Sequence, residues 1–404
     1  MLTPEYFDVA ADDILTLYHK LDDSGVEAIC KRLARIGYVT GATAWQANRL
    51  QEAGLLYEDM ISKIAATIGA SRKAVQKMFE DAAVEALEYD DSIYVAAGLT
   101  PPPIPLSPAI LASLQAGLKK TNGVLQNLTA TTALSAQQAY LQAVDLAYMQ
   151  ITTGILDYQT AIAQAVRSAA QTGLNVLYPS GHVDSLDVAI RRACLTGVNQ
   201  TCAEAQIIRA DEMGCDLVET TAHLGARPDH QAWQGEVFSR SGKSTKYRPF
   251  SVTGYGKGSG LCGWNCRHSF FPFFEGLSES AYPRDTLEEY RTRTVKYGDR
   301  EISYYDATQI QRKMERSIRE TKRTLSGIDA ARKEADSRAL EAEFEKESVK
   351  LKQQESSLNI FCRETGLYRQ RNREQVYASK HGGFNRSVAQ KAVWANKKAR
   401  QKRT

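Results

Sequence analysis

Residues 221–276 constrain the fold of this chain more than any other segment. They contain nine glycines, ten aromatic residues, three of the six histidines and two of the seven cysteines of the chain. Glycine destabilises a helix by about 1 kcal/mol per residue, so a segment this rich in glycine is not expected to form a regular helix. The sequence therefore predicts a compact, irregular unit here, built around clustered polar side chains.

The rest of the 404-residue chain has the pattern of a helical protein. The predicted fold class is mainly α, with long helices, a small irregular α+β module rich in glycine and aromatic residues, and one β-hairpin. Five prolines in residues 99–108 remove backbone donors and fix an extended geometry, which predicts a linker. The predicted organisation is an N-terminal helical region (1–98), the proline-rich linker (99–108), a long-helix region (109–220), the module with its hairpin (221–305), a charged long helix (306–362) and a basic C-terminal arm (363–404).

Local signals place several helix boundaries. One helix is expected at 26–36. Another, at 72–87, is expected to begin after Ser71, whose side chain can accept an unpaired backbone N–H as an N-cap. Two helical pieces are expected at 184–196 and 197–219.

A β-hairpin is expected after the glycine-rich segment 221–276. A two-residue Gly-Asp turn at 298–299 lies between two short runs of alternating apolar and polar residues. This turn would put Val295 opposite Ile302, with Tyr297 and Tyr304 on the same face.

Two further stretches predict long helices. Residues 306–356 hold twelve Lys/Arg and eleven Asp/Glu, and this mixture of charges predicts a solvated helix with ion pairs four residues apart. Residues 109–172 predict one or two long helices with an apolar seam of 3.5-residue period, suited either to the protein's own core or to a bundle between subunits. The seam consists of Leu141, Val144, Tyr148, Ile151, Ile155, Tyr158 and Ile162.

The net charge of +4 hides an asymmetry along the chain. Residues 363–404 carry twelve Lys/Arg and two Glu, a net charge of +10, whereas residues 1–362 carry 39 basic and 45 acidic residues, a net charge of −6. A basic terminal arm either binds nucleic acid or another acidic surface, or serves as a solubilising end. The candidate DNA-contacting residues are Arg369, Arg371, Arg373, Lys380, Arg386, Lys391, Lys397, Lys398, Arg400, Lys402 and Arg403.

The same sequence argues against several classes of protein. No apolar run reaches the roughly 18 residues of a membrane span. The acidic N-terminus, MLTPEYFDVAADDIL, lacks a secretory apolar core, which predicts synthesis in the cytoplasm. Seven widely spread cysteines, an odd number, argue against a disulfide framework.

The pattern Cys262-x3-Cys266-x-His268 provides residue types that bind zinc. Thiolate and imidazole are good zinc ligands, and a tetrahedral site needs four, so His230, or His223 in its place, would complete the set. The spacing differs from the CxxC pair of a zinc ribbon. The alternative is structural: the cysteines are buried as small apolar groups and the histidines bond to loop backbone. Zinc is therefore a candidate, and no cofactor is assigned.

Catalytic interpretations of the same residues have less support. A cysteine with His230 or His268 as base and Asp229 as orienter would form a nucleophile–base pair, but no flanking signature of a hydrolase accompanies it. His223, His230 and Asp229 could hold a hydrolytic metal, although a second set of acidic ligands is not evident. The SGKST string at 241–245 lacks the upstream glycine of a phosphate-binding loop. No catalytic residue is assigned.

Three arginines of the module, Arg227, Arg248 and Arg267, have two interpretations. Stacked on aromatic rings or paired with carboxylates, they would order an irregular backbone. Alternatively, they would contact DNA phosphates. We favour the ordering role.

Several strings in and around the module resemble the phage minor capsid protein 2 family, which is found in tailed phages and prophages of Gram-positive bacteria. The main strings are HLGARPDHQAWQG at 223–235, GLCGWNCRH at 260–268 and FPFFEG at 271–276. The stretches at 199–204, 212–214 and 304–316 also fit, and shorter elements are similar to the Mu F-like head morphogenesis proteins. The matching motif positions are His223, Gly225, Arg227, Pro228, His230, Trp233, Gly235, Cys262, Asn265, Cys266, Arg267 and His268.

The resemblance implies a structural, non-enzymatic protein of the phage head. Its implied partners are the portal or major capsid protein, packaged double-stranded DNA and other copies of the chain around the portal, with no membrane. Its implied location is the head interior, after synthesis in the bacterial cytoplasm. The alternatives are a metal-dependent hydrolase, nuclease or toxin centred on the His/Cys cluster, and a DNA-binding protein without a virion role.

Overall fold

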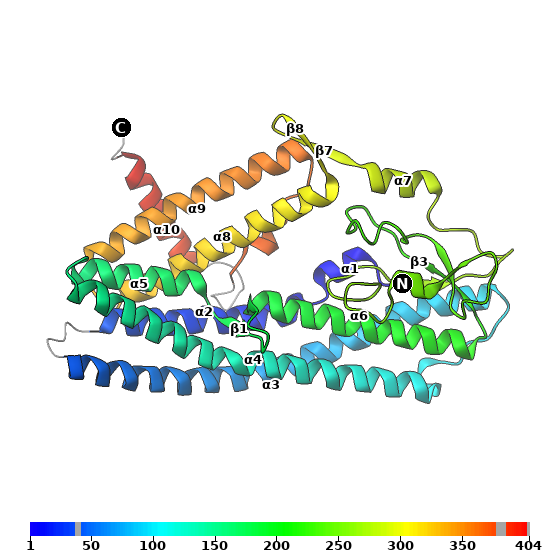
Figure 1. Ribbon diagram of the computed structural model, residues 1–404, viewed down its shortest axis with the longest axis horizontal. Helices are drawn as coiled ribbons and strands as arrows, with labels where there is room; N and C mark the ends of the chain where they lie inside the picture. Colours follow the sequence, from blue (N-terminus) through cyan, green and yellow to red (C-terminus); the bar gives the residue numbers. More distant parts are fainter. Residues whose placement is uncertain (37–41, 377–384, 402–404) are drawn as a thin grey trace. The chain divides into compact units, whose positions relative to one another are not determined.

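The computed structural model describes residues 1–36, 42–376 and 385–401, which form a mainly α-helical protein (Figure 1). The helices are α1 (Pro4–Val9), α2 (Asp12–Arg35), α3 (Ala42–Ala96), α4 (Pro108–Thr152), α5 (Tyr158–Thr172), α6 (Leu186–Glu212), α7 (Arg284–Thr292), α8 (Tyr304–Arg332), α9 (Arg338–Thr365) and α10 (Arg386–Gln401). Short 3₁₀ turns are η1 (Ile104–Leu106), η2 (Phe250–Thr253) and η3 (Arg371–Glu374). The strands are β1 (Asn175–Leu177), β2 (Val183–Ser185), β3 (Leu217–Thr220), β4 (Val237–Ser239), β5 (Arg248–Pro249), β6 (Phe270–Pro272), β7 (Thr294–Tyr297) and β8 (Arg300–Ser303). None of the described helices combines the length and the apolar character that crossing a membrane requires.

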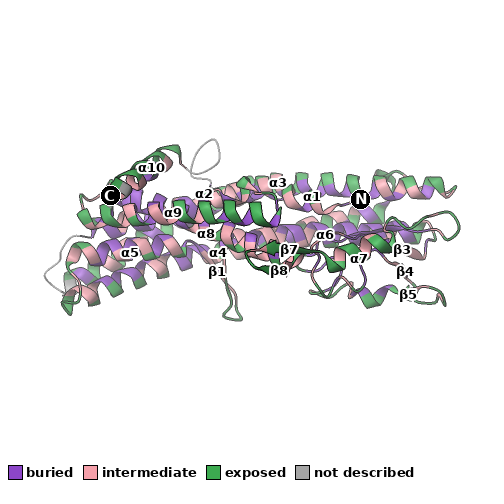
Figure 2. Cartoon of the chain, turned by 90° about the horizontal axis from the view of Figure 1, so that it is seen from above, coloured by how far each residue is buried: buried purple, intermediate pink, exposed green. Residues whose placement is uncertain are grey.

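The chain divides into two compact units, each built from three separate segments. Unit 1 contains Met1–Ile14, Ser71–Gln126 and Ile190–Thr308, and unit 2 contains Leu15–Ala70, Asn127–Ala189 and Gln309–Thr404. Every boundary between segments falls inside a helix, namely α2, α3, α4, α6 or α8. Within each unit, buried and exposed residues alternate along the helices, as packing of amphipathic helices requires (Figure 2).

Unit 1 contains a four-stranded sheet in the order β5-β4-β3-β6. β3 pairs antiparallel with both β4 and β6, so that Val218 lies opposite Phe238 on one side and Pro272 on the other. Strands this short are not stable alone, and burial of apolar side chains holds them in place. The buried cluster on the sheet consists of Ala203 from α6 with Val218, Trp233, Phe238, Phe250, Leu261, Cys262, Cys266 and Phe270.

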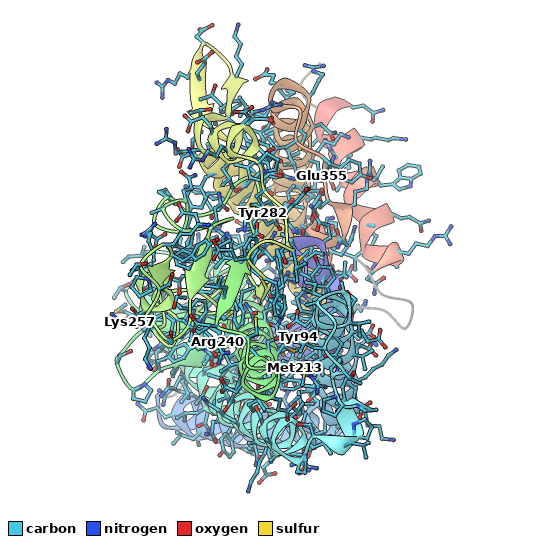
Figure 3. The ribbon with its side chains drawn as sticks, turned by 90° about the vertical axis from the view of Figure 1, so that its right-hand side faces the viewer. Tyr94, Met213, Arg240, Lys257, Tyr282 and Glu355 are labelled. Carbon is cyan, nitrogen blue, oxygen red and sulfur yellow. The ribbon has the colours of Figure 1, made fainter. Side chains whose placement is uncertain are left out.

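The side chain of Arg240, directly after β4, binds two groups near the end of α6. Arg240 donates a hydrogen bond to the carbonyl oxygen of Cys215 at 2.6 Å and forms an ion pair with Asp211. The same junction holds Tyr94 and Met213, which pack with the buried Cys215 (Figure 3). These contacts fix the point at which the chain leaves α6 and enters β3.

Unit 2 contains a buried ion pair between α2 and α8. Nη1 of Arg323 lies 2.9 Å from Oδ2 of Asp22, and Nη2 donates to the carbonyl oxygen of Gln171 at 2.9 Å. Oδ1 of Asp22 accepts the backbone N–H of Leu174 at 2.7 Å. Because the last carbonyl groups of a helix have no partner within that helix, Arg323 both neutralises Asp22 and caps the end of α5.

The predicted mainly α fold class is confirmed, and so is the register of the hairpin. Val295 in β7 pairs with Ile302 in β8, as the two-residue turn predicted. Tyr304 was expected on the hairpin beside Tyr297 but is the first residue of α8. Its backbone N–H donates to the carbonyl oxygen of Arg293 at 3.0 Å, so the helix begins directly where the strand ends.

Two predicted helix boundaries in the first half of the chain are wrong. Ser71 does not cap a helix, because α3 runs through it without a break and its side chain is buried. α6 likewise continues through Gly197 and ends at Glu212. Glu219, expected in a helix, belongs to the central strand β3. The helix expected at 26–36 is the second half of α2.

The charged helix expected over 306–356 is two helices. α8 ends at Arg332 and α9 begins at Arg338. The hydroxyl of Ser337 accepts the backbone N–H of Leu340 and thereby caps the second helix. The break therefore has a local cause, an N-cap inside a stretch that otherwise favours helix.

The apolar seam predicted along residues 109–172 is interrupted. α4 ends at Thr152 and α5 begins at Tyr158, so the repeat does not follow one helix. Ile155 lies in the connection and is 70% exposed. Tyr148 packs against Trp45 with ring centroids 5.1 Å apart, both within unit 2. This part of the seam thus contributes to the protein's own core.

Candidate functional site

The loops that flank β3 and β6 bring residues of the glycine-rich module together in unit 1. His230 lies in a run of turns between β3 and β4, and its carbonyl oxygen accepts the backbone N–H of Gln234 at 3.0 Å. Cys266 and His268 lie in the segment that leads into β6. Because Thr220 at the end of β3 pairs with Phe270 at the start of β6, the two segments converge at one end of the strand pair.

Three side chains form a compact group at this point. The Nδ1 atoms of His230 and His268 are 3.3 Å apart, and Sγ of Cys266 lies 3.9 Å from the first and 3.6 Å from the second. The exposed fractions of His230, Cys266 and His268 are 2%, 4% and 1%. Two imidazoles and a thiol that converge in this way have the chemistry and the spacing to hold a metal ion.

A glutamine orients the ring of His268. Oε1 of Gln234 lies 3.1 Å from Nε2 of His268 and accepts the backbone N–H of His223 at 3.1 Å. Since a backbone N–H only donates, the amide oxygen faces it, and Nε2 of His268 must carry the proton that it donates to the same oxygen. Nδ1 of His268 is therefore left as an acceptor that faces Cys266.

An asparagine on α6 holds the segment that carries Cys266 and His268. Nδ2 of Asn199 donates to the carbonyl oxygens of Cys266 and His268, each at 3.2 Å. Asn199 is itself buried, so both carbonyl groups are satisfied away from water. The helix thus positions the two residues through their backbone, whatever their side chains bind.

Burial determines the protonation of the group. Burial, together with the neighbouring histidines, lowers the pKa of His268 well below its ordinary value, and burial also lowers the pKa of His230. Burial raises the pKa of the Cys266 thiol. Both rings are therefore neutral near pH 7, as metal ligands must be, whereas the thiol gives up its proton only to a strong cation.

The other two candidate ligands take different positions. Sγ of Cys262 lies 3.6 Å from the carbonyl oxygen of His268, within the apolar cluster on the sheet. Nδ1 of His223 lies 3.0 Å from the carbonyl oxygen of Leu224, and its ring stacks on that of His268 with centroids 4.5 Å apart. The structure thus brings together His230, His268 and one cysteine, and it places Cys262 and His223 beside this group.

The three arginines of the module contact other groups of the protein. Each forms an ion pair with a carboxylate of unit 1: Arg227 with Asp229 at 3.8 Å, Arg248 with Glu236 at 2.8 Å and Arg267 with Asp8 at 2.6 Å. Arg248 also lies over the ring of Phe238, 5.7 Å from its centroid. These contacts favour the ordering role over contact with DNA. Asp229, considered as the orienter of a catalytic pair, has an arginine as its ionic partner.

The structure describes the basic arm over residues 363–376 and 385–401. It begins in the last turn of α9, and it contains η3 and the whole of α10. Ion pairs within unit 2 join Arg369 to Glu374, Lys391 to Asp329 and Lys398 to Glu345. The side chains of Arg371, Arg386 and Lys397 are exposed, and that of Arg373 is half-buried. The candidates Lys380, Lys402 and Arg403 and the side chain of Arg400 lie outside the described residues.

Sequence reasoning missed the residues that support the candidate ligands. Gln234 follows His230 by four residues, a spacing that puts two side chains on one side of a helical turn and could have indicated their proximity. Asn199 lies in one of the strings that carry the family resemblance, but it is 67 residues from Cys266. Only the fold brings such distant residues together.

The similarity of this chain to known proteins extends well beyond the module. The family model described as phage minor capsid protein 2 matches residues 2–363. A curated protein of Lactococcus phage LL-H, described as a structural protein, is 25% identical over 292 residues, which cover 69% of this chain and 76% of that relative. No solved structure matches the chain. The family match includes nearly all of unit 1 and continues through α8 and most of α9.

Proposed function

This chain belongs to the phage minor capsid protein 2 family, and from this premise we propose that it is a non-enzymatic structural protein of the phage head interior. The observation that carries the proposal is the family match over residues 2–363, which spans both units rather than one motif. We further propose that it docks on the portal or the inner capsid through its helices. Its C-terminal arm then contacts the packaged DNA.

The burial of the His/Cys group supports a role without catalysis. A hydrolytic metal centre keeps one coordination position open to substrate and water. Here His230, Cys266 and His268 are at most 4% exposed. A group that is closed to solvent in this way is better suited to stabilising the fold than to binding a substrate.

An exposed apolar stripe on α3 supports docking through helices. Leu50, Tyr57 and Ile61 are 59%, 39% and 43% exposed, and their spacing of seven and four residues puts them on one side of the helix. Large apolar side chains that remain in water become favourable contacts when a partner covers them. A ring of portal or capsid subunits is the partner that a minor head protein has available.

The composition of the arm supports contact with DNA. The arm carries a net charge of +10 against −6 for the rest of the chain, and it lies almost wholly beyond the family match. On α10, Trp394 is 74% exposed and Nζ of Lys397 lies 6.0 Å from the centre of its ring. Exposed cations beside an aromatic ring suit a phosphate backbone, and each neutralised phosphate releases counterions irrespective of base sequence.

Both contacts can be tested in particles of a phage that encodes the full chain. We expect the protein in purified, DNA-filled heads, protected from added protease until the heads are opened. Leu50→Asp/Ile61→Asp should reduce the number of copies per head at least tenfold, because two apolar contacts worth about 1.5–3 kcal/mol each are lost. Val84→Asp, on the same helix and 45% exposed, is the matched control.

The arm is tested in the same particles. Arg386→Glu/Lys397→Glu should leave the copy number unchanged but reduce ultraviolet crosslinking to DNA, whereas Lys243→Glu/Lys257→Glu, with the same change of charge, should not. Equal crosslinking in both variants would overturn the DNA contact. Absence of the wild-type chain from the heads would overturn the proposed function as a whole.

A further inference from the structure

We propose that His230, Cys266 and His268 bind one zinc ion, and that this ion holds together the irregular loops of the 221–276 module. The proposal concerns the stability of unit 1. It does not depend on which head component the protein contacts. It rests on the geometry of three side chains, on the hydrogen bonds that orient them and on the backbone around them.

The distances among the ligand atoms fit a tetrahedral zinc ion. Ordinary Zn–N and Zn–S bonds of about 2.0 and 2.3 Å at tetrahedral angles place two ligand nitrogens about 3.3 Å apart, and a nitrogen about 3.5 Å from a sulfur. The two Nδ1 atoms are 3.3 Å apart, and Sγ of Cys266 lies 3.6 Å from Nδ1 of His268 and 3.9 Å from Nδ1 of His230. One ion can therefore reach all three atoms with only a small adjustment of Cys266.

One choice of proton positions leaves Nδ1 of both rings as acceptors for a cation. Nε2 of His268 donates to Oε1 of Gln234, and Nε2 of His230 lies 2.9 Å from the carbonyl oxygen of Ser259. When Nε2 of each ring carries the proton, the two Nδ1 lone pairs face each other. Two acceptors at 3.3 Å repel unless a cation or a proton lies between them. Metal-binding histidines typically donate their second N–H in this way, to a carbonyl or a carboxylate.

The surrounding backbone explains what the ion would do. Among the described residues outside glycine, Cys262 and Asn265 alone have positive φ, at 57° and 55°, and both lie just before the ligand pair. A left-handed backbone at residues with side chains costs of order 1–3 kcal/mol each, so another interaction must hold it. Zinc bound to Cys266 and His268 on one side and to His230 on the other would clamp this segment to the turns after β3.

The structure selects one of the two module cysteines. Cys262 contacts a carbonyl oxygen inside the apolar cluster and stands outside the three-residue group, although sequence spacing made it an equal candidate. Three protein ligands leave one tetrahedral position for water, an arrangement common in catalytic zinc sites. The near-complete burial of the three ligands favours a structural ion here.

A metal-free network is the competing arrangement. Nη2 of Arg227 lies 2.6 Å from Nε2 of His230. If Arg227 donates there, Nδ1 of His230 carries the proton and donates it to Nδ1 of His268. The two arrangements therefore differ in the metal content of the purified protein.

Elemental analysis of the purified full chain distinguishes them. We expect about one zinc per chain in the wild type and in Cys262→Ser, and loss of the zinc in Cys266→Ser and His268→Gln. Cys262→Ser is the matched control, since it alters a buried cysteine of the same motif. Removal of zinc by a chelator should lower the Tm of the wild type and leave that of folded Cys266→Ser unchanged.

Cobalt substitution of the wild type keeps the test decisive if the ligand variants fail to fold. Cobalt bound by this group should show the absorption of a tetrahedral ion and a charge-transfer band from one thiolate. Absence of both zinc and the cobalt bands in the folded wild type would overturn the proposal in favour of the metal-free network. Retention of zinc in Cys266→Ser, or a charge-transfer band of two thiolates, would overturn the ligand set.

Discussion

Asp90 lies in surroundings that disfavour the negative charge an aspartate ordinarily carries. It is 1% exposed, and its Oδ2 accepts a hydrogen bond from Nε2 of Gln206 at 2.9 Å. Its Oδ1 is buried with no hydrogen-bond partner in the described part of the chain. Burial raises the pKa of Asp90 well above the ordinary 3.8, although Gln206, the N-terminal amine and Arg209 oppose the shift. The fold therefore resists ionisation of this side chain.

Asp90→Asn should stabilise the protein at neutral pH, because asparagine keeps an oxygen for Gln206 and removes a charge that the fold resists. In the unfolded chain an aspartate ionises above about pH 4, whereas in the folded protein Asp90 stays protonated to higher pH because its pKa is raised. The wild type therefore loses stability as the pH rises from the pKa of the unfolded state to that of the folded state. The increase in the free energy of unfolding caused by Asp90→Asn should be small near pH 4 and on the order of 1 kcal/mol at pH 7. Urea unfolding across this range measures it.

The neighbouring aspartate provides a control of opposite sign. Oδ1 of Asp91 lies 3.1 Å from Nε of Arg209, whose side chain is fully buried. Asp91→Asn leaves a buried cation with less compensation and should destabilise the protein at pH 7. Equal effects of the two substitutions, or a gain for Asp90→Asn that is the same at every pH, would contradict this account.

At the candidate site, residue types were predictable and the ligand set was not. His230, Cys262, Cys266 and His268 could be selected because few side chains bind zinc and these lie close in sequence. Which sulfur faces the histidines depends on the path of the loop, and Cys262 is directed to a carbonyl oxygen by a backbone of positive φ. A sequence pattern contains no signal for that conformation at a residue other than glycine.

At the scale of elements, two glycine–threonine pairs set the approach of α4 and α6 in unit 1. Gly117 and Thr121 lie four residues apart on α4, and Gly197 and Thr201 lie four residues apart on α6. A methyl group at Gly117 would be 2.1 Å from Oγ1 of Thr201, and one at Gly197 would be 2.2 Å from Oγ1 of Thr121. The helices therefore touch through positions that tolerate no larger side chain.

Gly117→Ala should destabilise the protein by about 1–3 kcal/mol, because the new methyl group forces the two helices apart. Gly123 is the control: it lies on the same helix, and a methyl group there would meet nothing within 4 Å. Gly123→Ala should stabilise by up to about 1 kcal/mol through helix propensity alone. Thermal unfolding of both variants tests the pair, and effects of the same sign would contradict the proposed contact.

Elements with local causes were predictable, whereas the ends of the long helices were not. The β7–β8 hairpin follows from a two-residue turn, which fixes register without help from the rest of the chain. Ser71 and Ser337 give the same local signal for an N-cap, yet Ser337 caps α9 and Ser71 is buried inside α3. Whether a serine begins a helix or lies inside one depends on the residues that pack around it. The fold class was therefore predictable, but these helix ends were not.

At the scale of the whole molecule, each unit depends on segments that are far apart in the chain. The N-terminal segment 1–14 belongs to the same unit as the sheet and the candidate metal ligands His230, Cys266 and His268. Phe7 is fully buried, and its carbonyl oxygen accepts a hydrogen bond from Nη2 of Arg191 at 3.0 Å. Asp8 forms an ion pair with Arg267, the residue between Cys266 and His268. The segment is therefore structurally part of the module that it precedes by some 200 residues.

Phe7→Ala should consequently weaken the module and not only α1. Truncation of a buried phenylalanine costs about 3–5 kcal/mol, and in a cooperative unit this cost appears wherever exchange requires opening of the whole unit. Hydrogen exchange of the amides in β3 and β6 should accelerate. Val9→Ala is the control, since Val9 lies on the same short helix but is 58% exposed, and it should change stability by less than about 0.5 kcal/mol. Faster exchange in α1 alone would show that the N-terminal segment is an appendage and that the sheet is stable without it.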